Sequence, residues 1–187
     1  MTVRLVLVSP AFGRALREAR FDDGGPLEDA GLAAARAAAD SLPAVGRLLT
    51  SPTARCRQTA AALGPGAADV AELAALDVGR WRGQTLDEVG RAEPEAVGAW
   101  LGDPSAAPHG GESVAQLCAR AAAWLDVAAE DAGRTLAVVE PEIVRALVLR
   151  ALDAPLSAFW RIDVPPLTAT ELSGRAGRWN LRAGRPL

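Results

Sequence analysis

Arg55 is the residue whose type and position point most directly to chemistry. It stands in the stretch SPTARCRQTA (51–60), where Ser51 suits the N-cap of a helix and Pro52 suits its first turn. A guanidinium held in the first turn of a helix, next to the helix N-terminus, favours the binding of an anion. The alternative is that Arg55 forms a structural ion pair with a carboxylate of the protein, for which Glu140 is a candidate.

Several acids and a single histidine supply the other groups that could move protons. Asp77 precedes Gly79, so its carboxylate either lines a pocket or closes an Asx turn. His109 is the only histidine, and an imidazole can act as an acid, a base or a ligand near neutral pH unless it is simply a loop residue. Glu112 and Glu142 also fit the first turns of helices. The spacing of these groups matches no metal-binding motif, so we expect neither a metal nor a cofactor.

The apolar pattern predicts alternating strands and helices. The stretch 3–8 (VRLVLV) is nearly continuous in β-branched residues and leucine, which is typical of a strand buried on both faces. Further strands are predicted at 46–50, 135–139, 167–172 and 178–181. Helices are predicted at 27–42, from 51 onward, and at 85–92, 95–101, 114–128 and 142–152. This order indicates an α/β protein, a three-layer α/β/α sandwich with a mainly parallel central sheet, in a single domain spanning 1–187.

The composition is that of an ordinary globular protein of 187 residues. Half of the residues are apolar, 23% are charged and the formal net charge is −3. The arginines are scattered among acids, so we expect no binding to nucleic acid. Cys56 and Cys118 lie in helical patterns, which favours free buried thiols in a reducing cytoplasm. The apolar stretch at the N-terminus is too short for a signal peptide or a membrane span, so we expect no membrane contact.

Five stretches carry a pattern known from one protein family. They are the strand at 3–8, SPTARCRQTA at 51–60, LDVGRWRG at 76–83, PHGGES at 108–113 and VVEPEIVRA at 138–146. The second matches S-P-x-x-R-x-x-Q-T-A. The last is similar to V-T-H-P-x-V-V-R-A with glutamate in place of histidine. On these stretches the chain resembles the histidine phosphatase superfamily, which has the phosphoglycerate mutase-like fold, over nearly its whole length.

The resemblance implies a site from which most catalytic groups of the family are missing. The first strand leads in the family into Arg-His-Gly, whereas Ser9 and Pro10 stand here in place of the arginine and the first catalytic histidine. Glu140 aligns with the second histidine, and Ala75 aligns with the acid that protonates the leaving group. Arg55 is the cation that is carried over. Because proline has no nucleophilic side chain, phosphohistidine chemistry at this position is not expected.

The same resemblance places the remaining polar groups around the pocket. Glu140 is expected at the strand end that points into it, where a desolvated carboxylate can serve as a general acid or base. Arg55 is then the anion holder, unless the two residues pair and close the old site. The residues expected to contact a substrate are Ser9, Asp77, His109, Glu112 and Glu142.

Three functions are open on this basis. The first is a repurposed enzyme that uses acid–base catalysis on a small organic molecule in a biosynthetic pathway. The second is a non-catalytic pseudophosphatase that binds a ligand or acts as a scaffold. The third is an unconventional phosphomonoesterase with Ser9 as nucleophile, although the chain has no lysine to activate it.

Electrostatics favour one class of ligand over another. A carboxylate about 5 Å from a phosphoryl group repels each unit of its charge by roughly 3 kcal/mol at an effective dielectric constant of about 20. A neutral or cationic small molecule, or a monoanion, is therefore expected rather than a phosphodianion. A homodimer is compatible with the fold, although no exposed apolar stripe in the sequence establishes one.

Overall fold

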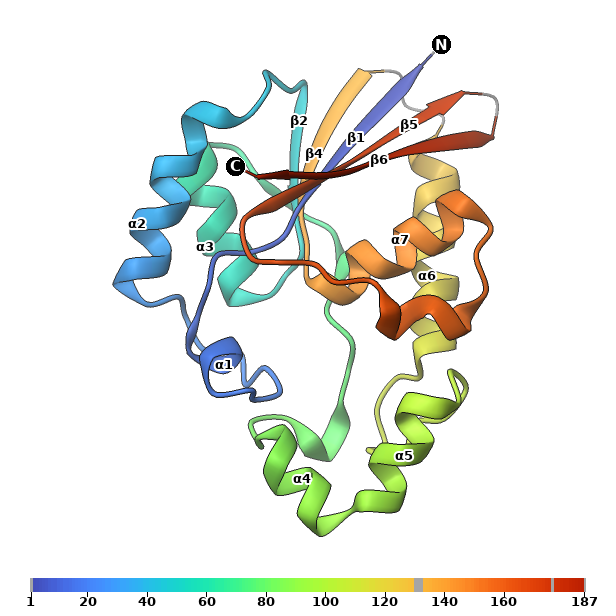
Figure 1. Cartoon of the computed structure of the whole chain (residues 1–187). Helices are drawn as coiled ribbons and strands as arrows, with labels where there is room; N and C mark the ends of the chain where they lie inside the picture. The colour runs from blue at the N-terminus through green and yellow to red at the C-terminus, as the bar shows by residue number, and fades with distance from the viewer. Residues whose placement is uncertain (1, 130–132, 176, 187) are drawn as a thin grey trace.

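The strand β1 (Val3–Val8) lies inside the sheet, and five of its six residues are buried. The computed structural model describes residues 2–129, 133–175 and 177–186. β1 pairs in parallel with β4 (Gly133–Val138) and antiparallel with β5 (Thr168–Arg175). The six-stranded sheet has the order β3-β2-β4-β1-β5-β6 (Figure 1), and its other strands are β2 at Arg47–Thr50, β3 at Ala68–Asp69 and β6 at Arg178–Pro186. Strands β1 to β4 are parallel, and β5 and β6 add an antiparallel edge.

Helices cover both faces of this sheet. They are α2 (Asp29–Ala38), α3 (Ala54–Leu63), α6 (Val114–Ala128) and α7 (Pro141–Leu152). Successive side chains of a strand point to opposite faces. Accordingly, Leu5 and Leu7 pack in a core with α6 and α7, whereas Val6 and Val8 pack in a second core with α3. Figure 1 shows α2 and α3 on one side of the sheet and α6 and α7 on the other. The predicted three-layer α/β/α sandwich is confirmed.

Short helices gather beyond the carboxyl ends of the parallel strands (Figure 1). They are the α-helices α1 (Arg14–Arg17), α4 (Leu86–Ala92) and α5 (Pro94–Gly102), together with 3₁₀ turns that include η2 (Ala71–Leu73), η3 (Gly79–Trp81) and η4 (Leu156–Arg161). Trp81, from the tryptophan-containing motif at 76–83, is fully buried among them. Its ring centroid lies 5.5 Å from those of Phe21 and Trp100. This aromatic cluster fixes the segments that surround the site.

The start of α3 differs from the prediction. We expected Ser51 as N-cap and Pro52 in the first turn, but the helix begins at Ala54 with Thr53 as its N-cap. The Thr53 hydroxyl oxygen accepts the Cys56 amide proton at 3.4 Å. The backbone N–H of Ser51 instead donates to the carbonyl oxygen of Val138 in β4 at 2.8 Å, which keeps Ser51 in the extended connection.

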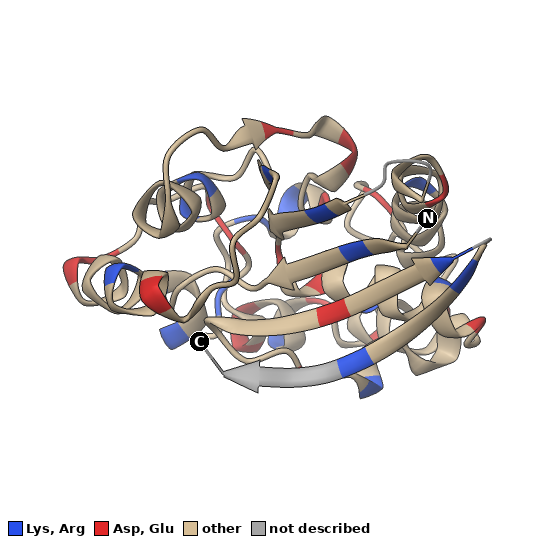
Figure 2. Ribbon diagram, turned by 90° about the horizontal axis from the view of Figure 1, so that it is seen from above, with Lys and Arg blue, Asp and Glu red and all other residues tan. Residues whose placement is uncertain are grey.

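The surface charges and the cysteines agree with the composition. Figure 2 shows acidic and basic positions interspersed over the helices and strands that it draws. Cys56 and Cys118 are buried free thiols, as predicted. Within the described part of the chain, no helix is long and apolar enough to cross a membrane.

Candidate ligand-binding site

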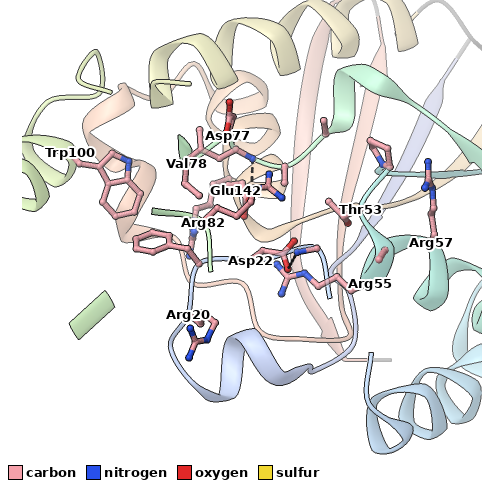
Figure 3. Close-up of a pocket in the computed structure, with 18 of the residues that line it drawn as sticks. Arg20, Asp22, Thr53, Arg55, Arg57, Asp77, Val78, Arg82, Trp100 and Glu142 are labelled. Carbon is pink, nitrogen blue, oxygen red and sulfur yellow. Dashed lines mark hydrogen bonds between the residues drawn. The ribbon is translucent and has the colours of Figure 1, made fainter. Parts of the chain in front are cut away.

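A cavity of about 680 Å³ lies at the carboxyl edge of the parallel strands. Its walls come from the connection 20–24, the start of α3, the segment 74–78, the first turns of α7 and two tryptophans, Trp100 and Trp160. Figure 3 shows it extending from Trp100 on one side to Arg57 on the other. The volume is within the usual range for sites that hold small organic molecules.

Arg55 and Glu140 form a closed ion pair in the wall of this cavity. The Glu140 side chain is completely buried, and the Arg55 side chain is 15% exposed. Arg55 donates from Nε to Glu140 Oε1 at 2.8 Å and from Nη2 to Oε2, so the contact is bidentate. The Thr53 hydroxyl also donates to Oε1, at 2.8 Å. Glu140 is not among the residues that line the cavity.

The charge on Arg55 is firmly held. Burial opposes this charge, but the nearby carboxylates, Glu140 first among them, together more than offset burial and raise the pKa of the guanidinium. Glu142 and Asp22 act in the same direction, and Figure 3 shows Asp22 beside Arg55. Of the two alternatives for Arg55, the structural ion pair is the one present in the structure.

Glu142 is the acid that faces the cavity from α7. It lies in the first turn of the helix, is half-buried and lines the cavity (Figure 3). Its Oε1 accepts the Leu76 amide proton at 3.2 Å. Burial raises the pKa of Glu142, the charge of Glu140 raises it further, and Arg55 partly opposes both. A carboxyl group in this environment can hold a proton and donate it to a ligand.

Asp77 and His109 lie on adjoining loops. Asp77 is exposed and lines the cavity, and its Oδ1 accepts the Gly79 amide proton at 3.0 Å in the anticipated Asx turn. His109 is buried, and its ring centroid lies 5.0 Å from that of Trp81. Its Nδ1 accepts the Gly111 amide proton at 3.0 Å, so a neutral ring carries its hydrogen on Nε2. Burial lowers the pKa of His109, and the nearby Asp77 opposes this.

Ser9 and Glu112 make contacts within the protein. Ser9 is buried, and its hydroxyl oxygen accepts the Thr168 amide proton at 3.0 Å while it donates to the carbonyl oxygen of Pro165. Glu112 forms an ion pair with Arg120 at 2.7 Å. The Arg120 guanidinium also donates to the carbonyl oxygens of Glu72, Ala74 and Ala75. Glu112 thus supports the segment that forms one wall of the cavity.

The structure therefore brings together only some of the predicted residues. Arg55, Asp77 and Glu142 line one cavity, and Glu140 lies directly behind Arg55. Ser9, His109 and Glu112 are not among its lining residues. Among the residues that the structure describes, no group of three or more His, Cys, Asp or Glu side chains is arranged to hold a metal ion.

Neither Arg145 nor Trp160 was among the predicted site residues, although both line the cavity. Arg145 stands three residues after Glu142 in α7, and residues with this spacing share a helix face. That spacing was the available signal for Arg145. Trp160 lies in η4, which packs against α6 and α7, so its place at the cavity depends on tertiary packing.

The sequence profile of the histidine phosphatase superfamily (branch 1) matches residues 15–185. The chain belongs to this superfamily. The bifunctional protein Rv2228c of Mycobacterium tuberculosis is 30% identical over 104 residues, which make up 54% of this chain and 29% of that protein. The chain thus matches less than a third of the length of this relative.

Solved structures of phosphatases share the histidine phosphatase fold seen here. The mycobacterial glucosyl-3-phosphoglycerate phosphatase Rv2419c in complex with VO3 superposes with a TM-score of 0.88 at 24% identity, over 98% of this chain and 99% of that one. The α-ribazole phosphatase of Shigella flexneri superposes with a TM-score of 0.85 at 18% identity, over 97% and 95% of the two chains. At this level of identity the likeness establishes the fold alone.

Proposed function

We propose that this member of the histidine phosphatase superfamily binds a small organic molecule in the 680 Å³ cavity and does not transfer phosphoryl groups. The observation that carries the proposal is the closed network of Arg55, Glu140 and Thr53. It directs two donor nitrogens of the retained guanidinium at a protein carboxylate. A ligand phosphate would have to compete with that carboxylate for the same donors.

The energy of that competition favours the existing pair. Removing one partner from a buried ion pair typically costs about 3–5 kcal/mol, because the other charge is left uncompensated. The groups near the end of β1 offer no replacement chemistry. Pro10 has no nucleophilic side chain, the Ser9 hydroxyl is held by backbone groups of Pro165 and Thr168, and the only histidine lies outside the cavity lining.

Acid–base catalysis on the bound molecule is the second candidate function. Our sequence-based hypothesis was an enzyme of a biosynthetic pathway, in which Glu140 acts as the acid or base and Arg55 holds an anion. The geometry favours Glu142 for the proton transfer instead, because Glu142 lines the cavity and its pKa is raised by burial. Glu140 has no comparable access to a ligand.

The test measures phosphate release and ligand binding on the same protein. Phosphate release from a broad panel of phosphomonoesters should stay at the level of the buffer blank for the natural protein and for Arg55→Ala. In a thermal-shift screen of small organic acids, amines and neutral rings, at least one class should raise the melting temperature. A ligand at 100 times its Kd stabilises the folded state by about 2.7 kcal/mol.

A cavity-filling variant locates the binding. Ala75→Trp places a large ring in the wall of the cavity and should abolish the thermal shift, whereas Ala61→Trp on the exposed face of α3 should preserve it. Phosphate release at enzymatic rates that disappears in Arg55→Ala would overturn the proposal. Chemical conversion of a bound compound that is lost in Glu142→Gln would establish the second candidate instead.

A further inference from the structure

The arginines that line the cavity are not equally available to a ligand. Five line it, and three of them are paired with carboxylates. The pairs are Arg20 with Glu18 at 3.1 Å, Arg55 with Glu140, and Arg57 with Asp69. Within the described residues, no ion pair involves the other two, Arg82 and Arg145.

Arg145 is the better placed of these two cations. Arg82 is exposed, so water competes fully for its donors, whereas Arg145 is half-buried in α7. Arg145 donates from Nε to the carbonyl oxygen of Ile162 at 2.8 Å, which fixes the side chain and leaves its two terminal nitrogens without a protein acceptor among the described residues. Burial lowers the pKa of Arg145, and the nearby charges of Glu142 and Asp163 only partly oppose this.

Aromatic rings surround this guanidinium. Its central carbon lies 5.6 Å from the ring centroid of Trp160 and 5.9 Å from that of Phe159. The rings of Trp160 and Trp100 have centroids 4.5 Å apart, and the ring of Phe21 follows 5.7 Å from that of Trp100. The rings of Phe21, Trp100 and Trp160 all line the cavity. A cation with free donors therefore stands beside a wall of aromatic surface.

We propose that the cavity takes a planar aromatic carboxylate, with the carboxylate on the terminal nitrogens of Arg145 and the ring against Trp100 and Trp160. The inference rests on the proposed small-molecule binding function and names the ligand class. A carboxylate matches the fork of a guanidinium in two parallel hydrogen bonds. Aromatic rings pack favourably on tryptophan in offset or edge-to-face arrangements.

The acids of the cavity decide the charge that a ligand can carry. Asp22, Asp77 and Glu142 all line it, and Glu142 is three residues from Arg145 on the same helix. A single negative charge is compensated by Arg145, whereas a second one has no buried cation left to meet it among the described lining residues. A phosphate dianion is thus disfavoured relative to a carboxylate of the same size.

Three probes with one ring system test this inference: 2-naphthoate, the neutral 2-naphthamide and 2-naphthyl phosphate. Binding is measured by calorimetry and by quenching of tryptophan fluorescence. We expect 2-naphthoate to bind about tenfold or more tightly than either of the others. A hydrogen bond to a charged group stabilises a complex more than one between neutral groups, and the difference corresponds to about tenfold in Kd. Arg145→Gln should remove the preference for the carboxylate over the amide.

Two further variants separate a binding role from a structural one. Arg150→Gln is the matched control, because Arg150 lies on the same helix α7, is half-buried, pairs with Asp126 at 2.8 Å and does not line the cavity. It should keep the preference for 2-naphthoate. Trp160→Leu removes part of the aromatic wall and should weaken the acid and the amide alike. Far-UV circular dichroism and the melting temperature report whether each variant is folded.

The natural protein alone can overturn the inference. If 2-naphthamide binds as tightly as 2-naphthoate, or if neither binds while other small molecules do, the ligand class is wrong and the binding function stands. If Arg145→Gln folds and keeps the preference, the assignment of Arg145 is wrong. Release of phosphate from 2-naphthyl phosphate would instead contradict the proposed function itself.

Discussion

Glu140 is completely buried, yet its surroundings satisfy it as an anion. Two nitrogens of Arg55 and the hydroxyl of Thr53 donate to its two oxygens. Taking a carboxylate out of water is costly, and this cost is offset only where charge and hydrogen bonds are both supplied. The network therefore depends on every member, and replacing one side chain should leave the others without their charge or hydrogen-bond partner.

Glu140→Gln tests this dependence. The amide has nearly the same shape as the carboxylate but leaves the charge of Arg55 uncompensated, so we expect a loss of about 3–5 kcal/mol in the free energy of unfolding. Urea denaturation measures it. The double variant Arg55→Met/Glu140→Leu removes both charges and should recover most of the loss, because apolar replacement of a buried pair is often neutral. A loss below about 1 kcal/mol in Glu140→Gln would show that the pair contributes little.

The sequence anticipated this pair only as one of two alternatives. The types and positions of Arg55 and Glu140 fit an open site and a closed pair equally well. The hydrogen-bond network of the closed pair also includes the hydroxyl of Thr53, and the position of this hydroxyl depends on where α3 begins. Arg145 was missed for a related reason. Its importance comes from the absence of an ion-pair partner among the described residues, which a sequence does not show.

Two loops cross at the wall of the cavity that carries Asp77, and their backbones are joined by hydrogen bonds. The Glu112 N–H donates to the carbonyl oxygen of Asp77 at 2.7 Å, and the Arg80 N–H donates to that of His109 at 3.1 Å. A Cβ atom on Gly111 would lie 2.1 Å from the carbonyl oxygen of Asp77, which leaves no space for a side chain. Gly111 of the PHGGES stretch therefore serves this crossing.

Gly111→Ala should separate the two loops and loosen the wall that carries Asp77. We expect a loss of more than about 2 kcal/mol in the free energy of unfolding, because backbone would have to shift. Binding of any ligand to the cavity should weaken as well. Gly98→Ala is the control, since this glycine lies within α5 with open space around it and alanine favours a helix. It should be neutral or slightly stabilising. Equal unfolding curves for the two variants would contradict the account of the crossing.

The regular elements were far more predictable than this crossing. The apolar run 3–8 gives β1 at Val3–Val8, and the amphipathic pattern at 114–128 gives α6 with the same bounds. These patterns involve residues close together in the chain, so they can be recognised from the sequence alone. The positions of the loops depend instead on contacts between 77–80 and 109–112, which are about thirty residues apart. The order of strands and helices, together with the resemblance to the superfamily, predicted the arrangement of the layers and left the occupant of the cavity open.

At the scale of the whole molecule, two titratable groups, the buried His109 and the half-buried Glu142, oppose each other in their effect on stability. Burial lowers the pKa of His109 and raises that of Glu142. The histidine therefore favours the folded state above its ordinary pKa of about 6.5, and this contribution is lost as the pH falls. The acid favours the folded state below its ordinary pKa of about 4.3, and this contribution is lost as the pH rises. Between these two ordinary pKa values the two slopes have opposite signs.

Single variants should reveal each slope in the pH dependence of the melting temperature. In His109→Gln we expect a smaller fall in melting temperature from pH 7 to pH 5 than in the natural protein, because the unfolded chain no longer takes up that proton preferentially. The groups that act on His109 are Asp77, which favours its protonation, and Arg80, which opposes it.

In Glu142→Gln the opposite change is expected, with the melting temperature raised most at the upper end of the range. Each unit of difference between folded and unfolded pKa corresponds to about 1.4 kcal/mol. Parallel curves for all three proteins would mean that neither group titrates differently in the folded state, and the proton-holding role of Glu142 in the cavity would then have no basis.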